Sequence, residues 1–256
     1  MKRLLQKKNF KQLFIFAVVV AIVVASCIEI RGVEQPLTVK AGDTLTVEVK
    51  AWMDPYWNQP QSRLIIGFMA PKSWNARANM RMYYTSAFAN GTMSPVAANA
   101  TPHGSSQKWS EAIMERLGIG GNYINDLEWV VFQSDQAFDM SDIAEINALV
   151  TIKVKTGPEN LRVKLGYFSA SSAQELSESK FYGKWFTSCL DVTDGVGELI
   201  DFCSPQISAV QPSTATDNDI ITLKYDEDAI DTDLSGADKV FPVSYTHLTL
   251  PTTERV

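Results

Sequence analysis

The chain has 256 residues, 45% of them hydrophobic, which is the composition of a folded globular protein and not of a disordered one. It contains 23 Lys or Arg and 29 Asp or Glu residues, so its formal net charge is −6. This acidic balance argues against nucleic acid as a partner, because such binding depends on cationic patches and no basic run follows residue 11.

The N-terminal segment has the features of an export signal. Five cations precede an apolar run over residues 13–24, and Ala25 and Ser26 then lead to Cys27. The run is too short to be a confident membrane span. Small residues directly before a cysteine resemble the lipobox of bacterial lipoprotein precursors, in which the thiol is linked to diacylglycerol before cleavage. We therefore predict a signal peptide over residues 1–26 and lipidation at Cys27; a simple secretory peptide or a signal anchor is the alternative.

Alternation of apolar and polar residues dominates the next part of the chain. Leu45, Val47, Val49 and Ala51 alternate with polar residues after the turn at residues 41–43, which predicts a half-buried strand. Further strands are predicted at residues 63–69, 80–85, 127–133, 149–155, 161–169 and 184–192. Several short strands separated by turns predict a mainly β domain over residues 27–204, an immunoglobulin-like or jelly-roll β-sandwich.

Aromatic residues follow the first of these strands in a proline-bracketed segment. Flat rings there could stack on the apolar faces of sugars, while neighbouring polar side chains bond the hydroxyl groups. The candidate glycan-binding residues are Trp52, Asp54, Tyr56, Trp57, Asn58 and, in a similar segment, Trp74. The alternative is that these rings close the end of the sandwich core, as we expect for Trp109 and Trp129.

One helix is predicted as an insertion between strands, over residues 107–117. Ser105 or Ser106 can cap its start, and Gly118 can end it. Its apolar face is formed by Trp109, Ala112, Ile113 and Leu117.

The strands at residues 149–155 and 161–169 are predicted to form a hairpin through the loop at residues 157–160. In that register Lys155 faces Arg162 and Lys153 faces Lys164, so four cations share the outer face. Like charges directly opposite destabilise a sheet, so we expect acidic neighbours or an anionic partner such as a uronic-acid or sulfated glycan.

Cys189 and Cys203 lie in the exported part of the chain, where a disulfide can persist. Closing a loop of about 15 residues would stabilise the fold by roughly 3 kcal/mol. Two reduced, buried thiols are the alternative. Two thiols without a nearby histidine make an incomplete zinc set, so no metal site is predicted.

Catalytic motifs and cofactor motifs are absent from the sequence. The only histidines are His103 and His247, and there is no GxSxG motif, so Ser-His-Asp catalysis has little support. The Asp-rich segment at residues 217–238 lacks the EF-hand pattern. We predict a protein that is not an enzyme and has no cofactor; a glycan hydrolase that uses two carboxylates is the remaining enzymatic alternative.

A second, truncated domain is predicted to begin at Pro205 and to run to residue 242 as the start of an immunoglobulin-like fold. Residues 243–252 look like a translated sequencing adapter, so residues 243–256 are predicted to be a read-through tail. Without the five signal cations and Arg255, 17 cations remain, and without Glu254, 28 acids remain. The predicted mature body therefore carries 17 − 28 = −11 charges.

Four phrases of the chain carry a family resemblance, at residues 70–75, 118–122, 128–135 and 157–161. Together they resemble an uncharacterised family of Bacteroidota-type lipoproteins with a domain of unknown function, often encoded among glycan-utilisation genes. Residues 220–240 are similar to the opening of an early-set, starch-associated immunoglobulin-like domain.

The resemblance implies a lipid-anchored accessory protein at the outer membrane, which binds or presents polysaccharide to a transporter complex. The cell surface is the expected location, and the periplasmic face is the alternative. A structural or protein-interaction module of such a complex is the second function that the resemblance allows.

Overall fold

The computed structural model describes residues 27–54, 61–87, 89–117, 126–139, 145–203, 208–211, 220–225, 236–237, 239 and 241. The chain divides into two compact units, Met1–Ser204 and Pro205–Val256. In the second unit, β12 (Ser208–Gln211) pairs antiparallel with β13 (Thr222–Tyr225). The predicted signal peptide, most of the Asp-rich segment and the predicted tail lie outside the described residues.

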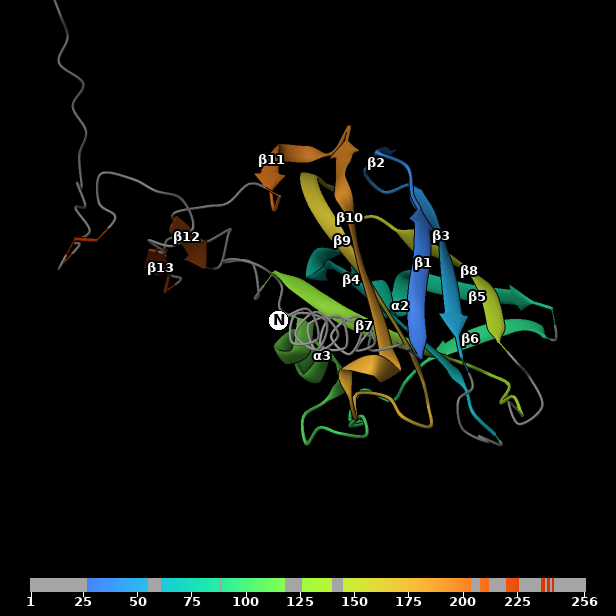
Figure 1. Ribbon diagram of the computed structural model, residues 1–256. Coiled ribbons are helices and arrows are strands. Elements are labelled where there is room, and N and C mark those ends of the chain that lie inside the picture. The colour runs from blue at the N-terminus through green and yellow to red at the C-terminus, as the bar shows by residue number, and fades with distance from the viewer. Residues whose placement is uncertain are drawn as a thin grey trace, which may run out of the picture. The chain divides into compact units, whose positions relative to one another are not determined.

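The first unit is built mainly of strands (Figure 1). They are β1 (Ile28–Glu34), β2 (Thr38–Lys40), β3 (Thr44–Met53), β4 (Leu64–Pro71), β5 (Met80–Ser86), β6 (Asn90–Pro95), β7 (Leu127–Ser134), β8 (Ile146–Lys155), β9 (Glu159–Ser171), β10 (Tyr182–Thr193) and β11 (Val196–Asp201). The described helical segments are η1 (Lys72–Trp74), α2 (Ala76–Asn79), α3 (Trp109–Leu117) and η2 (Ser179–Phe181).

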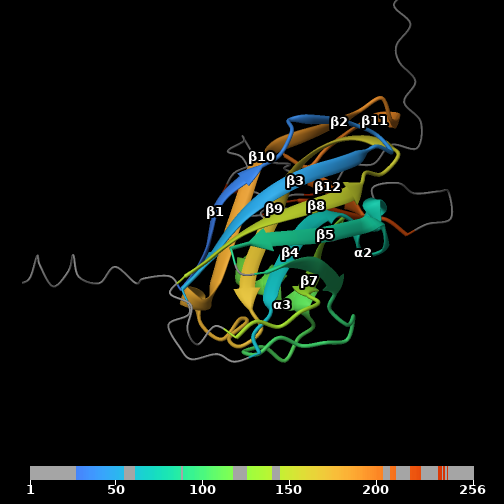
Figure 2. The ribbon, with the colours of Figure 1, turned by 90° about the vertical axis from the view of Figure 1, so that its right-hand side faces the viewer.

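These strands form one curled sheet in the order β1-β3-β8-β5-β6-β7-β4-β9-β10-β2. The sheet folds over on itself into two layers: the first layer holds β1, β3, β8, β5 and β6, and the second holds β7, β4, β9, β10 and β2 (Figures 1 and 2). Neighbours are antiparallel except β2, which runs parallel to β10, and β11, which runs parallel to the start of β9. The prediction of a β-sandwich with one inserted helix is confirmed.

The core lies between the layers and follows the period of two in the sequence. Along β3 the side chains of Leu45, Val47 and Val49 are buried, whereas Thr44 and Thr46 are exposed. Residues 165–171, the second half of β9, are buried on both faces, because α3 covers the outer face of the second layer at this point. There the Trp109 ring of α3 packs edge-on to Phe168, with 6.1 Å between ring centroids.

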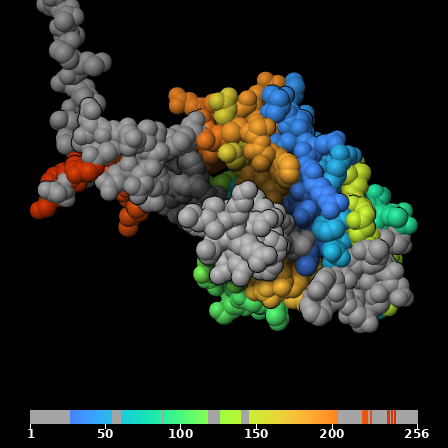
Figure 3. Space-filling model, viewed as in Figure 1, coloured from blue at the N-terminus to red at the C-terminus, as the bar shows by residue number. Residues whose placement is uncertain are grey.

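The two layers also meet where β1 passes β10. A Cβ added at Gly183 of β10 would lie 2.8 Å from the backbone nitrogen of Ile30, so β1 lies directly on this glycine. Farther along, the Gln35 amide donates to the Ser188 carbonyl at 3.3 Å and accepts from the Tyr167 hydroxyl at 2.9 Å. In the space-filling view, the surface of β1 and β3 lies against that of β10 (Figure 3).

The predicted hairpin between β8 and β9 is wrong. β8 pairs with β3 and β5, and β9 pairs with β4, β10 and β11, so the two strands belong to different layers. The chain crosses between the layers at Thr156 and Gly157. Thr156 is buried and its backbone N–H donates to the Asp43 carbonyl at 3.0 Å, while the Gly157 carbonyl accepts from Gly42 N–H at 3.0 Å. The connection is therefore bound to the turn before β3.

Candidate functional site

The outer face of the first layer is the candidate site. Figure 2 looks onto it, and no helix of the described residues lies across it. Paired residues on neighbouring strands project from the same side of a sheet, so the strand register shows which side chains are neighbours on this face. Tyr83 of β5 is opposite Thr151 of β8 and Thr92 of β6, and Thr85 is opposite Leu149 and Asn90. We call this surface the open face.

Tyr83 lies halfway along β5, the fourth of the five strands of the open face, and is 42% exposed. Its neighbours in β5 alternate: Met82 and Tyr84 point into the core, which turns Tyr83 outward. Hydroxyl and amide side chains surround it, at Thr85, Asn90, Thr92 and Thr151. The Thr92 hydroxyl donates to the Asp135 carboxylate. A ring among hydrogen-bonding groups is the arrangement that suits a sugar, with an apolar face and a polar rim.

Tyr83 is not among the predicted ligand residues, although the alternation of buried and exposed residues in β5 contains the signal. Its position between two buried residues of a strand predicts an outward ring.

Trp52 lies at one end of the open face, in β3. Its indole Nε1 donates to a carboxylate oxygen of Glu145 at 2.8 Å, and the Arg31 guanidinium lies 4.0 Å from the ring centroid. Hydrogen bonds from Trp52 and Asn147 hold the pKa of the Glu145 carboxyl below its usual range. The indole is therefore half-buried and fixed in orientation, with Arg31 over one of its faces.

Trp52 and Tyr83 lie on either side of one strand, β8, so they are two strand spacings apart. Along the strand direction they are four residues apart, in the registers of β3 with β8 and of β8 with β5. Strand spacings place their Cα atoms roughly 16 Å apart. The two rings can therefore belong to one extended binding surface but not to one sugar ring.

The remaining predicted ligand residues divide into three cases. Asp54 follows β3 and is half-buried, and its N–H donates to the Cys27 carbonyl at 2.7 Å. Tyr56, Trp57 and Asn58 lie outside the described residues.

Trp74 is only 1% exposed, so the interpretation of this residue as a ligand platform is wrong. The residue sits in η1 at the edge of the core. A Cβ added at Gly157 would lie 3.0 Å from the Trp74 ring, which shows how closely the crossing segment covers it.

Cys27 comes directly before β1. Its N–H donates to the Lys180 carbonyl at 2.8 Å, and its thiol is partly buried and unpaired. Burial, and after it the Asp54 carboxylate, raises the pKa of the thiol. The folded domain thus begins one residue after the predicted lipidation point. Lipidation itself stays a prediction.

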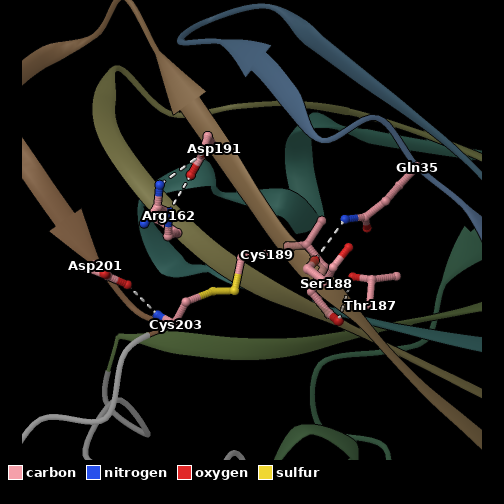
Figure 4. Close-up of a disulfide and its surroundings, with 9 residues drawn as sticks. Gln35, Arg162, Thr187, Ser188, Cys189, Asp191, Asp201 and Cys203 are labelled. Carbon is pink, nitrogen blue, oxygen red and sulfur yellow. Dashed lines mark hydrogen bonds and ion pairs between the residues drawn. A yellow bond between two sulfur atoms is a disulfide. The ribbon is translucent and has the colours of Figure 1, made fainter.

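Cys189 of β10 and Cys203 form a disulfide at the end of the first unit (Figure 4). It lies beside Arg162, whose Nε donates to the Asp191 carboxylate at 2.6 Å. The Asp201 carboxylate accepts from the Cys203 N–H at 2.7 Å. The bond ties the segment after β11 to the outer edge of the second layer. The second unit follows it in the chain.

The described residues contain no group of three or more His, Cys, Asp or Glu side chains placed to hold a metal ion. Within the same part of the chain, no helix has the length and apolar character needed to cross a membrane.

Residues 28–206, more than half of the chain, match a family described as "Domain of unknown function (DUF4961)". The chain belongs to the DUF4961 family. Residues 208–249 match a second domain of unknown function, DUF8578, and this match includes residues 243–249 of the predicted tail. The DUF4961 domain thus holds the whole open face, and the DUF8578 match, from residue 208, lies within the second unit, which begins at Pro205.

A search of curated proteins finds no significant match to the chain. Among solved structures, the chain resembles one described as "AvmM Catalyzes Macrocyclization in Alchivemycin A Biosynthesis", at 10% identity over 68% of this chain and 92% of that one, with a TM-score of 0.35. It also resembles a DUF4466 family protein from Parabacteroides merdae, at 7% identity over 66% of this chain and 46% of that one, with a TM-score of 0.31. Similarity at this level says nothing about what the DUF4961 domain does.

Proposed function

We propose that the chain is a lipid-anchored, non-enzymatic accessory protein that binds or presents polysaccharide for uptake across the outer membrane. The observation that carries the proposal is the open face, where the exposed ring of Tyr83 lies among threonine and asparagine side chains. The predicted signal peptide over residues 1–26, followed by Cys27, supports the location at the outer membrane, on the cell surface or on its periplasmic face.

The open face suits a long chain better than a small molecule. It is a sheet surface several strands wide, with Tyr83 on its fourth strand, β5, and Trp52 toward the end of its second strand, β3. A polysaccharide can lie along such a surface and make many weak contacts, and repeated contacts raise the effective affinity without a deep pocket.

Retention of the protein on polysaccharide gels tests the proposal. Protein without residues 1–26 should migrate more slowly in native gels that contain its polysaccharide. Tyr83→Ala should reduce the retardation, because it removes the exposed ring. The matched control is Trp185→Ala, which removes an aromatic ring of similar exposure, 38%, from β10 in the second layer. Folded protein that no polysaccharide retards, or equal loss in both variants, would contradict the proposal.

A protein-interaction module is the second candidate, because the structure also exposes apolar side chains at one end of the sandwich. Leu37, Val196 and Leu199 are 64%, 74% and 55% exposed, at the end where β2 and β11 lie (Figure 1). Large exposed apolar side chains favour contact with another protein. Co-purification of an outer-membrane transporter without added glycan, lost in Val196→Ser plus Leu199→Ser, would favour this function.

A carboxylate-based glycan hydrolase remains the third candidate. Release of reducing sugar by the folded protein would support it, and the same polysaccharide panel serves for that assay.

A further inference from the structure

Three cations lie side by side on the open face next to Tyr83. Arg81 precedes Tyr83 by two residues in β5, so both side chains project outward. Lys153 of β8 is directly opposite Arg81 in the register, and Lys155 follows on the same side of β8. All three are exposed. We call Arg81, Lys153 and Lys155 the basic cluster.

The acidic side chains of the open face that form hydrogen bonds or ion pairs form them with residues outside the basic cluster. Glu29, Glu34 and Glu145 bind Arg31, Lys50 and Trp52, respectively. Asp135, which follows β7, accepts a hydrogen bond from the Thr92 hydroxyl. Glu48 of β3 is diagonal to Lys153, roughly 7 to 8 Å away by strand geometry, and acts electrostatically on Lys50. No ion pair among the described residues joins the basic cluster to an acid.

Two like charges directly opposite each other destabilise a sheet. Arg81 and Lys153 form such a pair, on a protein body that is otherwise strongly acidic. An anion bound between them relieves this repulsion. Because the screening length is about 8 Å at physiological ionic strength, acids more distant than Glu48 weaken that attraction little.

Arg81 is held in place for such a contact. One guanidinium nitrogen, Nη1, donates to the Met80 carbonyl at 2.9 Å and to the Ala78 carbonyl at 3.3 Å. These bonds fix the side chain against the backbone of α2 and β5, and they leave Nε and Nη2 to bind a carboxylate.

We propose that the polysaccharide on the open face is acidic and carries uronic-acid carboxylates. The basic cluster binds the carboxylates, while Tyr83 packs against the apolar face of a neighbouring sugar ring. This inference rests on the proposed function and adds the substrate class to it. The basic cluster is formed by the pairing of β5 with β8. The predicted hairpin of β8 with β9 would have placed Lys153 opposite Lys164 instead.

Columns of immobilised polygalacturonate and of the same polymer fully methyl-esterified test the inference, because esterification removes the charge and keeps the sugar backbone. The protein should bind polygalacturonate about tenfold more tightly than the ester, which is about 1.4 kcal/mol. Salt should elute it, since about 1 M NaCl shortens the screening length to about 3 Å. Arg81→Gln plus Lys153→Gln should remove the preference for the acidic polymer.

The matched control is Lys164→Gln plus Lys184→Gln, which removes the same charge from exposed positions of β9 and β10 in the second layer and should leave the preference intact. Columns of dextran sulfate and of vesicles with anionic phospholipid distinguish carboxylated glycan from other anions.

The outcomes separate the two claims. Equal binding to both polymers, tighter binding to dextran sulfate or to vesicles, or a preference that survives Arg81→Gln plus Lys153→Gln would overturn the inference, while binding to a neutral polysaccharide would still support the proposed function. Failure of folded protein to bind any polysaccharide would overturn both.

Discussion

Removal of the disulfide should weaken the fold by an amount that the loop length sets. The cysteines are 14 residues apart, so the bond closes a loop of 15 residues in the unfolded chain. In the chain-entropy model this loop contributes about 3 kcal/mol. For a domain of this size, that loss lowers the melting temperature by about 6 to 12 °C.

The measurement is urea unfolding of protein without residues 1–26 that carries Cys27→Ser, which leaves no third thiol to mispair. In this background Cys189→Ala plus Cys203→Ala should lose about 3 kcal/mol of unfolding free energy. Reductant should lower the stability of the parent to the same level and should leave the double variant unchanged. A loss below about 1 kcal/mol would refute the reasoning, because the disulfide would then not stabilise the fold mainly by restricting the unfolded chain.

Two further predictions concern the contact between β1 and β10 and the Trp52 end of the open face. Gly183→Ala should destabilise the domain by about 1 to 3 kcal/mol in urea unfolding, because the new Cβ would meet the β1 backbone. The control is Gly32→Ala in β1, whose Cβ would meet only a Lys50 side-chain carbon at 3.6 Å and which should change the free energy of unfolding by less than about 0.5 kcal/mol. Equal effects of the two variants would contradict the close packing of β1 on Gly183. Because the pKa of Glu145 is depressed in the folded state, its ionised form adds stability that is present above about pH 4.3 and is lost as the pH falls through the folded pKa. The urea midpoints of the parent and of Glu145→Gln should therefore differ most near neutral pH and converge in acid; a constant difference would argue against the hydrogen bond from Trp52.

Much of the fold follows from the alternation in the sequence. The predicted strands at residues 63–69, 80–85 and 127–133 correspond to β4, β5 and β7, and the predicted helix begins two residues later than expected, at Trp109. In each of these elements the spacing of apolar residues matches the spacing of buried residues, so a pattern of a few residues is enough to predict the element. β1 was not predicted, because residues 28–34 contain Arg31 and Gly32 and alternate only at the start.

Strand pairing could not be read in the same way. β8 and β9 both alternate well and are joined by a short loop, which favours a hairpin. The crossing at Thr156 depends on hydrogen bonds to the turn at Lys40 and Asp43, more than a hundred residues away in the chain. Such contacts leave no local pattern in the sequence. The predicted pairing of Lys153 with Lys164 and of Lys155 with Arg162 was wrong for this reason.

The candidate site shows the same division. Trp52 could be predicted as a candidate from its residue type and its place after a strand pattern. The burial of Trp74, by contrast, depends on Gly157 from the crossing segment, which no local pattern predicts. Tyr83 and the basic cluster become neighbours only through the pairing of β5 with β8.

Hydroxyl-radical footprinting, read by mass spectrometry, tests most directly whether the open face binds polysaccharide. Tyr83 and Trp185 are exposed to similar extents, 42% and 38%, on the first layer and on β10. With a polysaccharide that retains the protein, oxidation of Tyr83 should slow several-fold while that of Trp185 stays unchanged. Protection of Trp185 with Tyr83 still fully reactive would place the ligand elsewhere and contradict the account.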